Sequence, residues 1–370
     1  MKMKSVYCYM LAGLMLSASS CSSWLSEDDA PVMSYDYYET EAGVNAAITA
    51  AYGFLRWGVG GERFDVLTEL GTDLFTEGED GSNRESYNKY ATQLNPDDGI
   101  LYEMWENHYK GISDANIAMQ KIRDSQDLLE SVKIQSYAEM QFIRAYLYFD
   151  LVQQFGRIPL VTEGSFEIRT DFKRAPIADV YNVIISDLRN AAENLPEKAS
   201  VLGRATRYSA AHLLAKVYLT RGSAVKDARG QKATDMDSTL YYAEQVINSG
   251  AYALQENFSS LWDIKNQGNS EAVFAVQFTT EPMFNGDGNK QHLYWLSWYE
   301  DQPGMLRDIE NGRPYRRHVA TKKTMDDLFD RLHDSRFYKS FKWVFYANNV
   351  SPLPVWESLS YDGNVLLKCK

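Results

Sequence analysis

The stretch AEMQFIRAYLYFDLVQQFGRIPLVTE, Ala138 to Glu163, predicts one long helix that ends at a glycine and continues into a short extended run. Its apolar side chains recur at helical spacing and therefore share one face of the helix; they are Phe142, Ala145, Tyr146, Phe149 and Val152. Gly156 can adopt the left-handed backbone that closes a helix, and Pro159 cannot continue one. Taken alone, the stretch indicates a helix with a buried face.

Similar helical patterns dominate the chain on both sides of this stretch. Further helices are predicted over 38–56, 101–123, 180–195 and 207–222, and a last one is predicted to start at Ser238 and end at Gly250. Thr206 is expected to cap the helix that begins at 207. Alanine and tyrosine recur on the inward faces, which favours stacked helical hairpins like those of tetratricopeptide repeats. An irregular helical bundle is the alternative, because no strict period of about 34 residues is visible.

The character of the chain changes after about Ala253. Residues 271–278, EAVFAVQF, are rich in strand-forming residues and predict a buried strand, and the loop-rich run 279–304 follows. A short helix is expected around 324–332 and extended runs near 338–346. The predicted fold class is therefore mainly α, a tetratricopeptide-like scaffold of helical hairpins with an irregular, loop-rich C-terminal part containing a few short strands. The predicted boundaries are 38–255 for the scaffold and 256–370 for the irregular part.

The N-terminus has the pattern of a secretory signal peptide over residues 1–20. Two lysines precede a short apolar run and a small-residue segment that ends at Cys21. Because Cys8 lies within the signal and the mature chain holds no paired cysteines inside its fold, Cys21 is better explained as a lipid attachment site than as half of a disulfide. Residues 21–37 would then form a polar tether to a membrane. A plain secretory signal is the alternative, since Ala18 stands where a lipoprotein signal prefers leucine.

Composition argues against several classes of function. The chain has 38 basic and 50 acidic residues, a formal charge of −12, which opposes binding to nucleic acid. No nucleophile elbow, zinc-protease motif or phosphate-binding loop occurs, and the five histidines lack the spacing of metal ligands. We therefore expect no catalytic residue, no metal site and no cofactor. A carboxylate pair such as Glu69 and Asp73 would suit a glycosidase, but sequence cannot show the distance between them.

Aromatic residues in two loop-like segments suggest a binding site for sugars. Pyranose rings present apolar faces that stack on aromatic side chains, while their hydroxyls need polar groups that donate and accept hydrogen bonds. The candidate ligand-binding residues are Trp57, Asp73, Asn83, Arg84, Gln291, Tyr294, Trp295 and Trp298. The alternative is that the rings fill a core, although glycine-rich and polar flanks favour exposure.

Five segments, in order along the chain, resemble the SusD/RagB family of Bacteroidetes surface lipoproteins. They are Phe64–Gly78, Ala138–Glu163, Gly203–Gly222, Ala243–Phe278 and Asp326–Asn348. The resemblance implies a lipid-anchored protein on the outer-membrane surface that captures an oligosaccharide and delivers it to a SusC-like TonB-dependent transporter. Oligopeptide cargo, as in RagB-type relatives, is the alternative that keeps the fold. A surface glycosidase is a third possibility, and a fourth is that truncation makes the chain a nonfunctional remnant.

One departure from the family concerns length. Family members are usually longer and finish with a helical segment that packs back on the scaffold. The resemblance therefore implies a chain shortened at its C-terminal end, with an apolar face of the C-terminal region left uncovered.

Overall fold

The computed structural model describes residues 40–369 except 79, 81–83, 91–93, 166–168, 226–228, 282, 284–285, 287, 343, 350–355 and 362–363. Cys21 and Asn83 lie outside the described residues. The α-helices are α2 Glu41–Gly53, α3 Arg56–Gly60, α4 Glu62–Thr68, α5 Glu85–Lys89, α6 Gly99–Asp124, α7 Glu130–Phe155, α8 Ile177–Asn194, α9 Arg207–Gly222, α10 Asp235–Ile247, α12 Gln291–Tyr294 and α13 Arg336–Ser340. Short 3₁₀-helices are η3 Phe258–Trp262, η4 Ile264–Asn266 and η5 Tyr299–Asp301, and η6 Lys323–Asp327 is a short π-helix.

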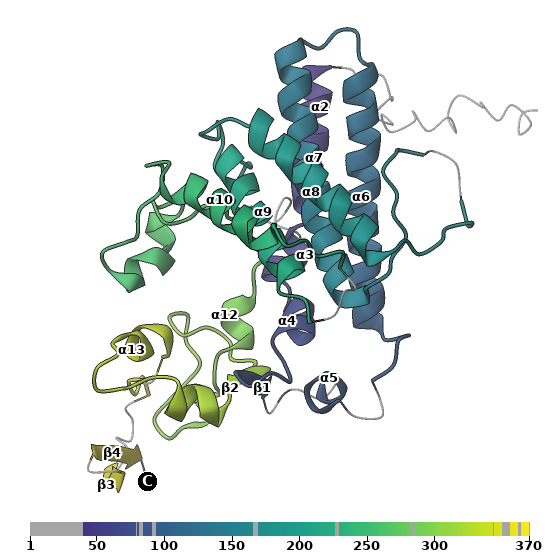
Figure 1. Ribbon diagram of the computed structural model, residues 1–370. Coiled ribbons are helices and arrows are strands. Elements are labelled where there is room, and N and C mark those ends of the chain that lie inside the picture. Colours follow the sequence, from purple (N-terminus) through teal and green to yellow (C-terminus); the bar gives the residue numbers. More distant parts are fainter. Residues whose placement is uncertain are drawn as a thin grey trace, which may run out of the picture.

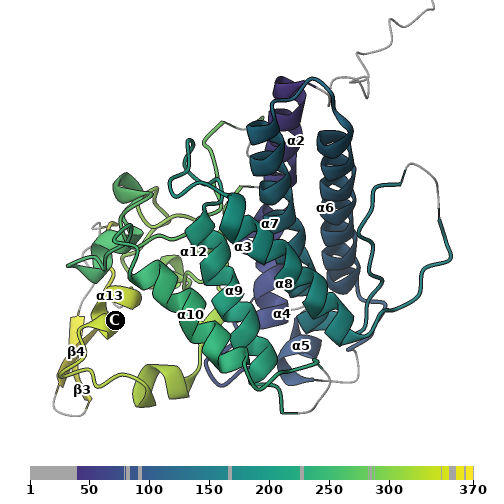
Figure 2. The ribbon, with the colours of Figure 1, turned by 45° about the horizontal axis from the view of Figure 1, so that its top comes forward.

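The long helices form an array in which each packs against the one before it. Helix α7 contacts α6 on one side and α8 on the other, α9 and α10 extend the row, and α2 lies against α6 and α7 (Figure 1). The turned view of Figure 2 shows the same order of helices, with the irregular C-terminal part beside α9 and α10. The fold is mainly helical and built from packed helical hairpins, as the sequence predicts. The boundary near residue 255 stays a prediction.

Helix α7 is the centre of the core and confirms the interpretation of the stretch quoted first. Phe142, Tyr148 and Phe149 are buried, and each such side chain contributes roughly 1.5–3 kcal/mol by leaving water. Gly156 closes the helix with φ 68° and ψ −113°, a positive-φ backbone that glycine adopts without steric strain but that is not the left-handed helical conformation expected. The helix begins at Glu130, earlier than the quoted stretch, and it packs beside α6.

Buried ion pairs fix neighbouring helices to one another. The guanidinium of Arg144 on α7 donates two hydrogen bonds of 2.8 Å to Asp187 on α8. Arg221 on α9 donates to both carboxylate oxygens of Asp235 on α10, at 3.0 and 2.6 Å. Because a buried charge without its partner is strongly unfavourable, these pairs disfavour arrangements of the helices in which the two partners are separated.

Of the two N-cap residues that the sequence predicts for the scaffold, Thr206 is confirmed and Ser238 is wrong. Thr206 caps α9 with a capping box, in which its hydroxyl accepts from the backbone N–H of Ser209 at 3.1 Å. Ser238 does not cap α10, which begins three residues earlier after Thr234. The Ser238 hydroxyl instead donates to the Thr234 carbonyl at 2.9 Å, a bond that a serine inside the first turn can make.

The prediction of a strand over 271–278 is wrong. The segment pairs with no strand among the described residues, and side chains of the scaffold donate to two of its carbonyls: Ser209 Oγ to that of Val273 at 3.1 Å and Arg56 Nε to that of Gln277 at 2.9 Å. Phe274 and Val276 pack against the helical core. The apolar run therefore covers a helical surface instead of pairing with another strand.

Within the described residues, the irregular part takes part in two small antiparallel sheets, one of which it shares with a strand from the N-terminal region. Strand β1 (Phe75–Glu77) pairs with β2 (His318–Ala320), and β3 (Trp356–Tyr361) pairs with β4 (Asn364–Cys369). The extended run predicted near 338–346 begins instead with the helical turn α13. Within the described residues, no helix is both long enough and apolar enough to span a bilayer. Apolar side chains such as Ile309, Leu332 and Tyr346 are exposed here, and the expectation about the chain's C-terminal end stays a prediction.

Candidate functional site

Two segments far apart in the sequence meet beside the scaffold, where β1 pairs with β2. Gly78 donates its N–H to the Arg317 carbonyl at 2.9 Å, so the ladder continues past the end of β1. A Cβ on Gly78 would lie 2.0 Å from the Arg316 carbonyl oxygen, so this close approach requires glycine. The side chains that this pairing gathers form what we name the junction cluster: Glu62, Asp65, Arg84, Gln291, Trp295, Arg317 and His318.

Trp295 is the aromatic centre of the junction cluster. Its indole N–H donates to Gln291 Oε1 at 3.0 Å, and Gln291 Nε2 donates to the Gly61 carbonyl at 3.4 Å. The ring of Phe75 meets Trp295 edge-on with centroids 4.8 Å apart, and the His318 ring lies 5.0 Å away. Trp295 is half-buried, so part of its surface remains open to solvent.

Tyr294 packs on the neighbouring side and is more enclosed. Its ring lies 5.8 Å from that of Tyr315, and the guanidinium of Arg317 sits 5.6 Å from its centroid. Tyr294 is buried, so its contacts are those of a core residue.

Charged groups surround this aromatic centre. The carboxylate of Glu62, which is buried, forms ion pairs with Arg84 and Arg317. His318 is 0% exposed, and its Nε2 lies 3.8 Å from Asp65 Oδ2. Neither ring nitrogen of His318 has a hydrogen-bond partner among the described residues.

Burial shifts the two titratable groups in opposite directions. Desolvation raises the pKa of the Asp65 carboxyl from 3.8 to about 6, against the lowering influence of contacts with Gln291 and Trp295. Desolvation, together with the positive charges of Arg84 and Arg317, lowers the pKa of His318 from 6.5 to about 4. At neutral pH the pair therefore consists of a carboxylate and a neutral imidazole. Perturbed groups of this kind are typical of functional sites, although structural networks produce them too.

The structure gathers four of the candidate residues chosen from the sequence and separates others from them. Arg84, Gln291, Tyr294 and Trp295 lie in or against the junction cluster. Trp57 instead packs edge-on against Phe64 and the buried His108 within the scaffold, with centroids 6.1 and 5.7 Å apart.

Asp73 and Trp298 lie outside the cluster. Asp73 is exposed, and Lys323 Nζ donates to its carboxylate at 2.7 Å, which lowers the pKa of Asp73. Trp298 is half-buried immediately before η5. The ligand-binding roles of all these residues stay predictions.

Sequence reasoning missed Glu62, Asp65, Arg317 and His318. Glu62 and Asp65 carry a weak signal, because both acids occupy the first turn of one helix. Glu62 becomes part of the junction cluster through its ion pair with Arg317, which lies 255 residues away in the sequence. No local pattern indicates so distant a contact.

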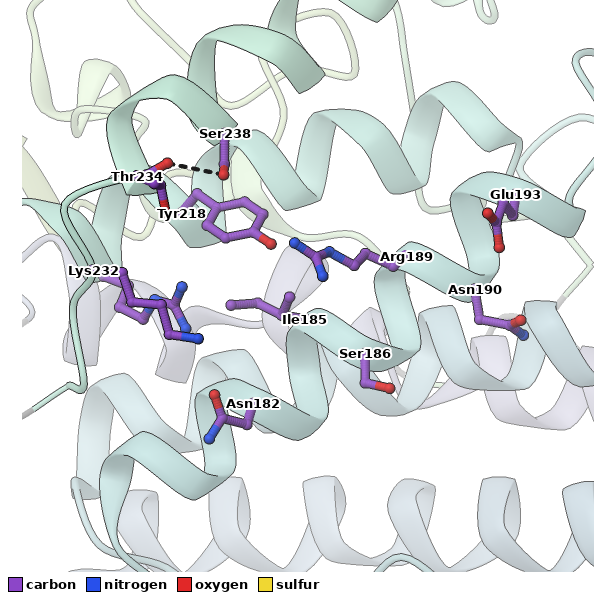
Figure 3. Close-up of a pocket in the computed structure, with 11 residues that line it drawn as sticks. Asn182, Ile185, Ser186, Arg189, Asn190, Glu193, Tyr218, Lys232, Thr234 and Ser238 are labelled. Atoms are coloured by element: carbon purple, nitrogen blue, oxygen red, sulfur yellow. Dashed lines mark hydrogen bonds between the residues drawn. The ribbon is translucent and has the colours of Figure 1, made fainter.

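Two cavities lie in the scaffold, away from the junction cluster. One, of about 460 Å³, opens between α8, α9 and α10 and is lined in part by Arg189, Arg221 and Lys232 (Figure 3). The other, of about 1060 Å³, runs between α6 and the segment that follows α7 and is lined in part by Trp105 and Tyr109. Of the candidate residues that the structure describes, none lines either cavity.

Comparison with known proteins adds a family context. The SusD-like family model described as "Starch-binding associating with outer membrane" matches residues 32–219. A SusD-like protein of Formosa agariphila is 27% identical over 341 residues, which cover 84% of this chain and 63% of the relative. The starch-binding protein SusD of Bacteroides thetaiotaomicron is 27% identical over 176 residues, 47% of this chain and 29% of that protein.

Solved structures agree with these matches. A laminarin-binding SusD-like protein is 25% identical with a TM-score of 0.67, covering 81% of this chain and 66% of that one. A SusD superfamily protein from Parabacteroides distasonis is 24% identical, with a TM-score of 0.63. The shared fold covers 80% of this chain and 60% of that protein. The chain spans 63% and 53% of the length of two SusD-like relatives from Formosa agariphila.

Proposed function

The chain belongs to the SusD-like family, and on that premise we propose that it is a cell-surface lipoprotein that binds an oligosaccharide. The observation that carries the proposal is the partly exposed side chain of Trp295, held in place by Gln291, Phe75 and His318. A fixed aromatic ring beside polar groups offers a pyranose both an apolar surface and hydrogen-bond partners. Because the ring is already oriented, little conformational entropy is lost when a sugar binds.

The proposed mechanism is capture without chemical change. A retaining or inverting glycosidase needs two carboxyl groups facing one another across the sugar, one of them with a raised pKa. The carboxylate of Asp73 is instead paired with Lys323, which keeps its pKa low. Asp65 has the raised pKa, but it faces the buried His318. This arrangement favours binding over hydrolysis.

We further propose anchoring through a lipid on Cys21 and delivery of the sugar to a SusC-like TonB-dependent transporter. The family's association with the outer membrane supports the anchoring. The rigid helical array would provide a broad surface for a transporter to contact.

Calorimetric titration of the purified protein tests the sugar-binding proposal. Laminarin, xyloglucan and starch oligosaccharides serve as ligands, with oligopeptides as the competing class. We expect Trp295→Ala to weaken binding of the preferred glycan at least about tenfold, as loss of a central aromatic contact usually does. Trp298→Ala is a second variant, chosen because Trp298 is half-buried and lies outside the junction cluster.

Trp262→Ala is the matched control. Trp262 is 72% exposed on η3, where it can be removed without touching the junction cluster. Unchanged melting temperatures would show that the variants remain folded. Binding of peptides in place of glycans, or glycan binding that neither Trp295→Ala nor Trp298→Ala reduces, contradicts the proposal.

A further inference from the structure

The smaller scaffold cavity gathers positive charge in a chain that is strongly acidic overall. Its volume is about 460 Å³, and three of its lining side chains are cations while Glu193 is the only acid among its described lining residues. The cations come from three places along the chain: Arg189 on α8, Arg221 on α9, and Lys232 just before α10 (Figure 3). We name this space the cationic cavity.

The three cations have different partners. Arg221 is 3% exposed and is neutralised by Asp235, to which it donates two hydrogen bonds of 3.0 and 2.6 Å. Arg189 and Lys232, in contrast, are exposed and have no carboxylate partner among the described residues, and Arg189 interacts instead with the hydroxyls of Tyr218 and Tyr242. Two cations facing one cavity repel each other, and a bound anion would remove that repulsion.

Arg189 is held so that its charge faces the cavity. Its guanidinium lies 5.8 Å from the ring centroid of Tyr218, whose ring stacks on Tyr242 at 5.8 Å with an angle of 7°. Arg221 lies over the same Tyr218 ring at 5.3 Å. Figure 3 shows the Arg189 side chain reaching from α8 toward the Tyr218 hydroxyl. The aromatic pair thus limits the positions that the guanidinium can take before any ligand arrives.

Neutral polar groups complete the wall of the cavity. Asn182 and Ser186 project from α8, and Ser238 lies on α10 with its hydroxyl bonded to the Thr234 carbonyl. Amides and hydroxyls of this kind can bond the hydroxyls of a sugar ring, while the cations bind a carboxylate or sulfate oxygen. A cavity of about 460 Å³ lies within the usual range for a small-molecule site.

We propose that the cationic cavity binds the carboxylate or sulfate group of an acidic saccharide, with Arg189 and Lys232 as the residues that contact the charge. This inference rests on the proposed glycan-binding function, but it places the acidic group at a different site from the junction cluster. Arg221 serves as a positioning residue, because its own charge is already neutralised by Asp235.

Binding measured by calorimetry tests the inference on the full chain. The probes are a galacturonate oligosaccharide, a sulfated oligosaccharide, a neutral oligosaccharide of equal length, and inorganic sulfate. We expect the double variant Arg189→Gln/Lys232→Gln to bind the acidic saccharides at least about tenfold more weakly, because two charge-assisted hydrogen bonds are lost. Binding of the acidic saccharides by the unmodified protein should also weaken as salt is raised.

Lys265→Gln is the matched control, since it removes an exposed lysine outside the cavity lining. Sulfate alone should bind more weakly to the double variant than to this control, which tests the cavity separately from any glycan. Trp295→Ala should reduce binding of the neutral saccharide and leave sulfate binding intact, so failure of the proposed function is distinguishable from failure of this inference. Equal affinity of the double variant and the control for acidic saccharides and sulfate would overturn it.

Discussion

The helical scaffold and the irregular part differ in how they are held together. Between α2 and α10 almost every long helix contributes fully buried apolar side chains to one continuous core. From residue 256 onward, the buried apolar side chains of the described residues are Tyr294, Tyr299, Met305 and Phe337. The comparison indicates that stability comes mainly from the scaffold, which leaves the irregular part to present binding residues.

The largest expected effect is the loss of a buried ion pair in the scaffold. Arg144→Leu would leave the Asp187 carboxylate buried without its cation, and we expect it to reduce the free energy of unfolding by about 3–5 kcal/mol. Urea denaturation measures the change. The double variant Arg144→Leu/Asp187→Leu should recover most of the loss, because neither charge then remains buried. If the free energy of unfolding of the single variant lies within about 1 kcal/mol of that of the unmodified protein, the pair is not important for the stability of the scaffold.

A pair of apolar truncations compares the two regions directly. Leu214 is buried in α9, and Leu214→Ala should destabilise the protein by about 2–5 kcal/mol through lost burial and a new cavity. Ile309 is fully exposed in the irregular part, and Ile309→Ala should change stability by less than about 0.5 kcal/mol. Thermal and urea unfolding test both. A large loss for Ile309→Ala would mean that another surface covers this residue.

The junction cluster predicts two opposing pH dependences. The folded-state pKa of Asp65 is raised to about 6, so the folded protein binds more protons there than the unfolded chain, and its contribution to stability falls as pH rises from about 4 to 6. The folded-state pKa of His318 is lowered to about 4, so its contribution to stability is lost as pH falls from about 6.5 to 4. In the unmodified protein the two trends largely cancel.

Single substitutions should reveal each trend alone. Asp65→Asn should make stability rise with pH between about 4 and 6.5, and His318→Gln should make it fall with pH between about 4 and 6, each by about 1–3 kcal/mol. Urea titrations at several pH values measure both slopes. Parallel slopes in the two variants would contradict the assignment, and the control Asp73→Asn, at an exposed site, should leave the pH profile within that window unchanged.

A smaller expected loss concerns the helix caps of the scaffold. Thr206→Ala removes the hydroxyl that caps α9 and should reduce stability by about 1 kcal/mol. Thr234 stands at the same position before α10, but its side chain makes no capping bond, so Thr234→Ala should have almost no effect. Equal losses in the two variants would show that the capping bond is not the cause.

Helix positions were more predictable from the sequence than the site. The apolar face of α7, the cap at Thr206 and the glycine at 156 depend on residues within a few turns of each other, so local patterns reveal them. The segment 271–278 has the composition of a strand, but its conformation depends on Ser209 and Arg56, which local sequence does not associate with it. The junction cluster requires β1 to pair with β2 across most of the chain, and no repeat or spacing marks that pairing.

The β1–β2 pairing and the Glu62–Arg317 ion pair together close a loop of chain that contains the entire row of helices from α5 to α10. A protease that cuts one exposed turn inside this loop would therefore leave two fragments held together by non-covalent contacts. Such a nicked protein would run as two bands on a denaturing gel yet elute from a sizing column as a single species.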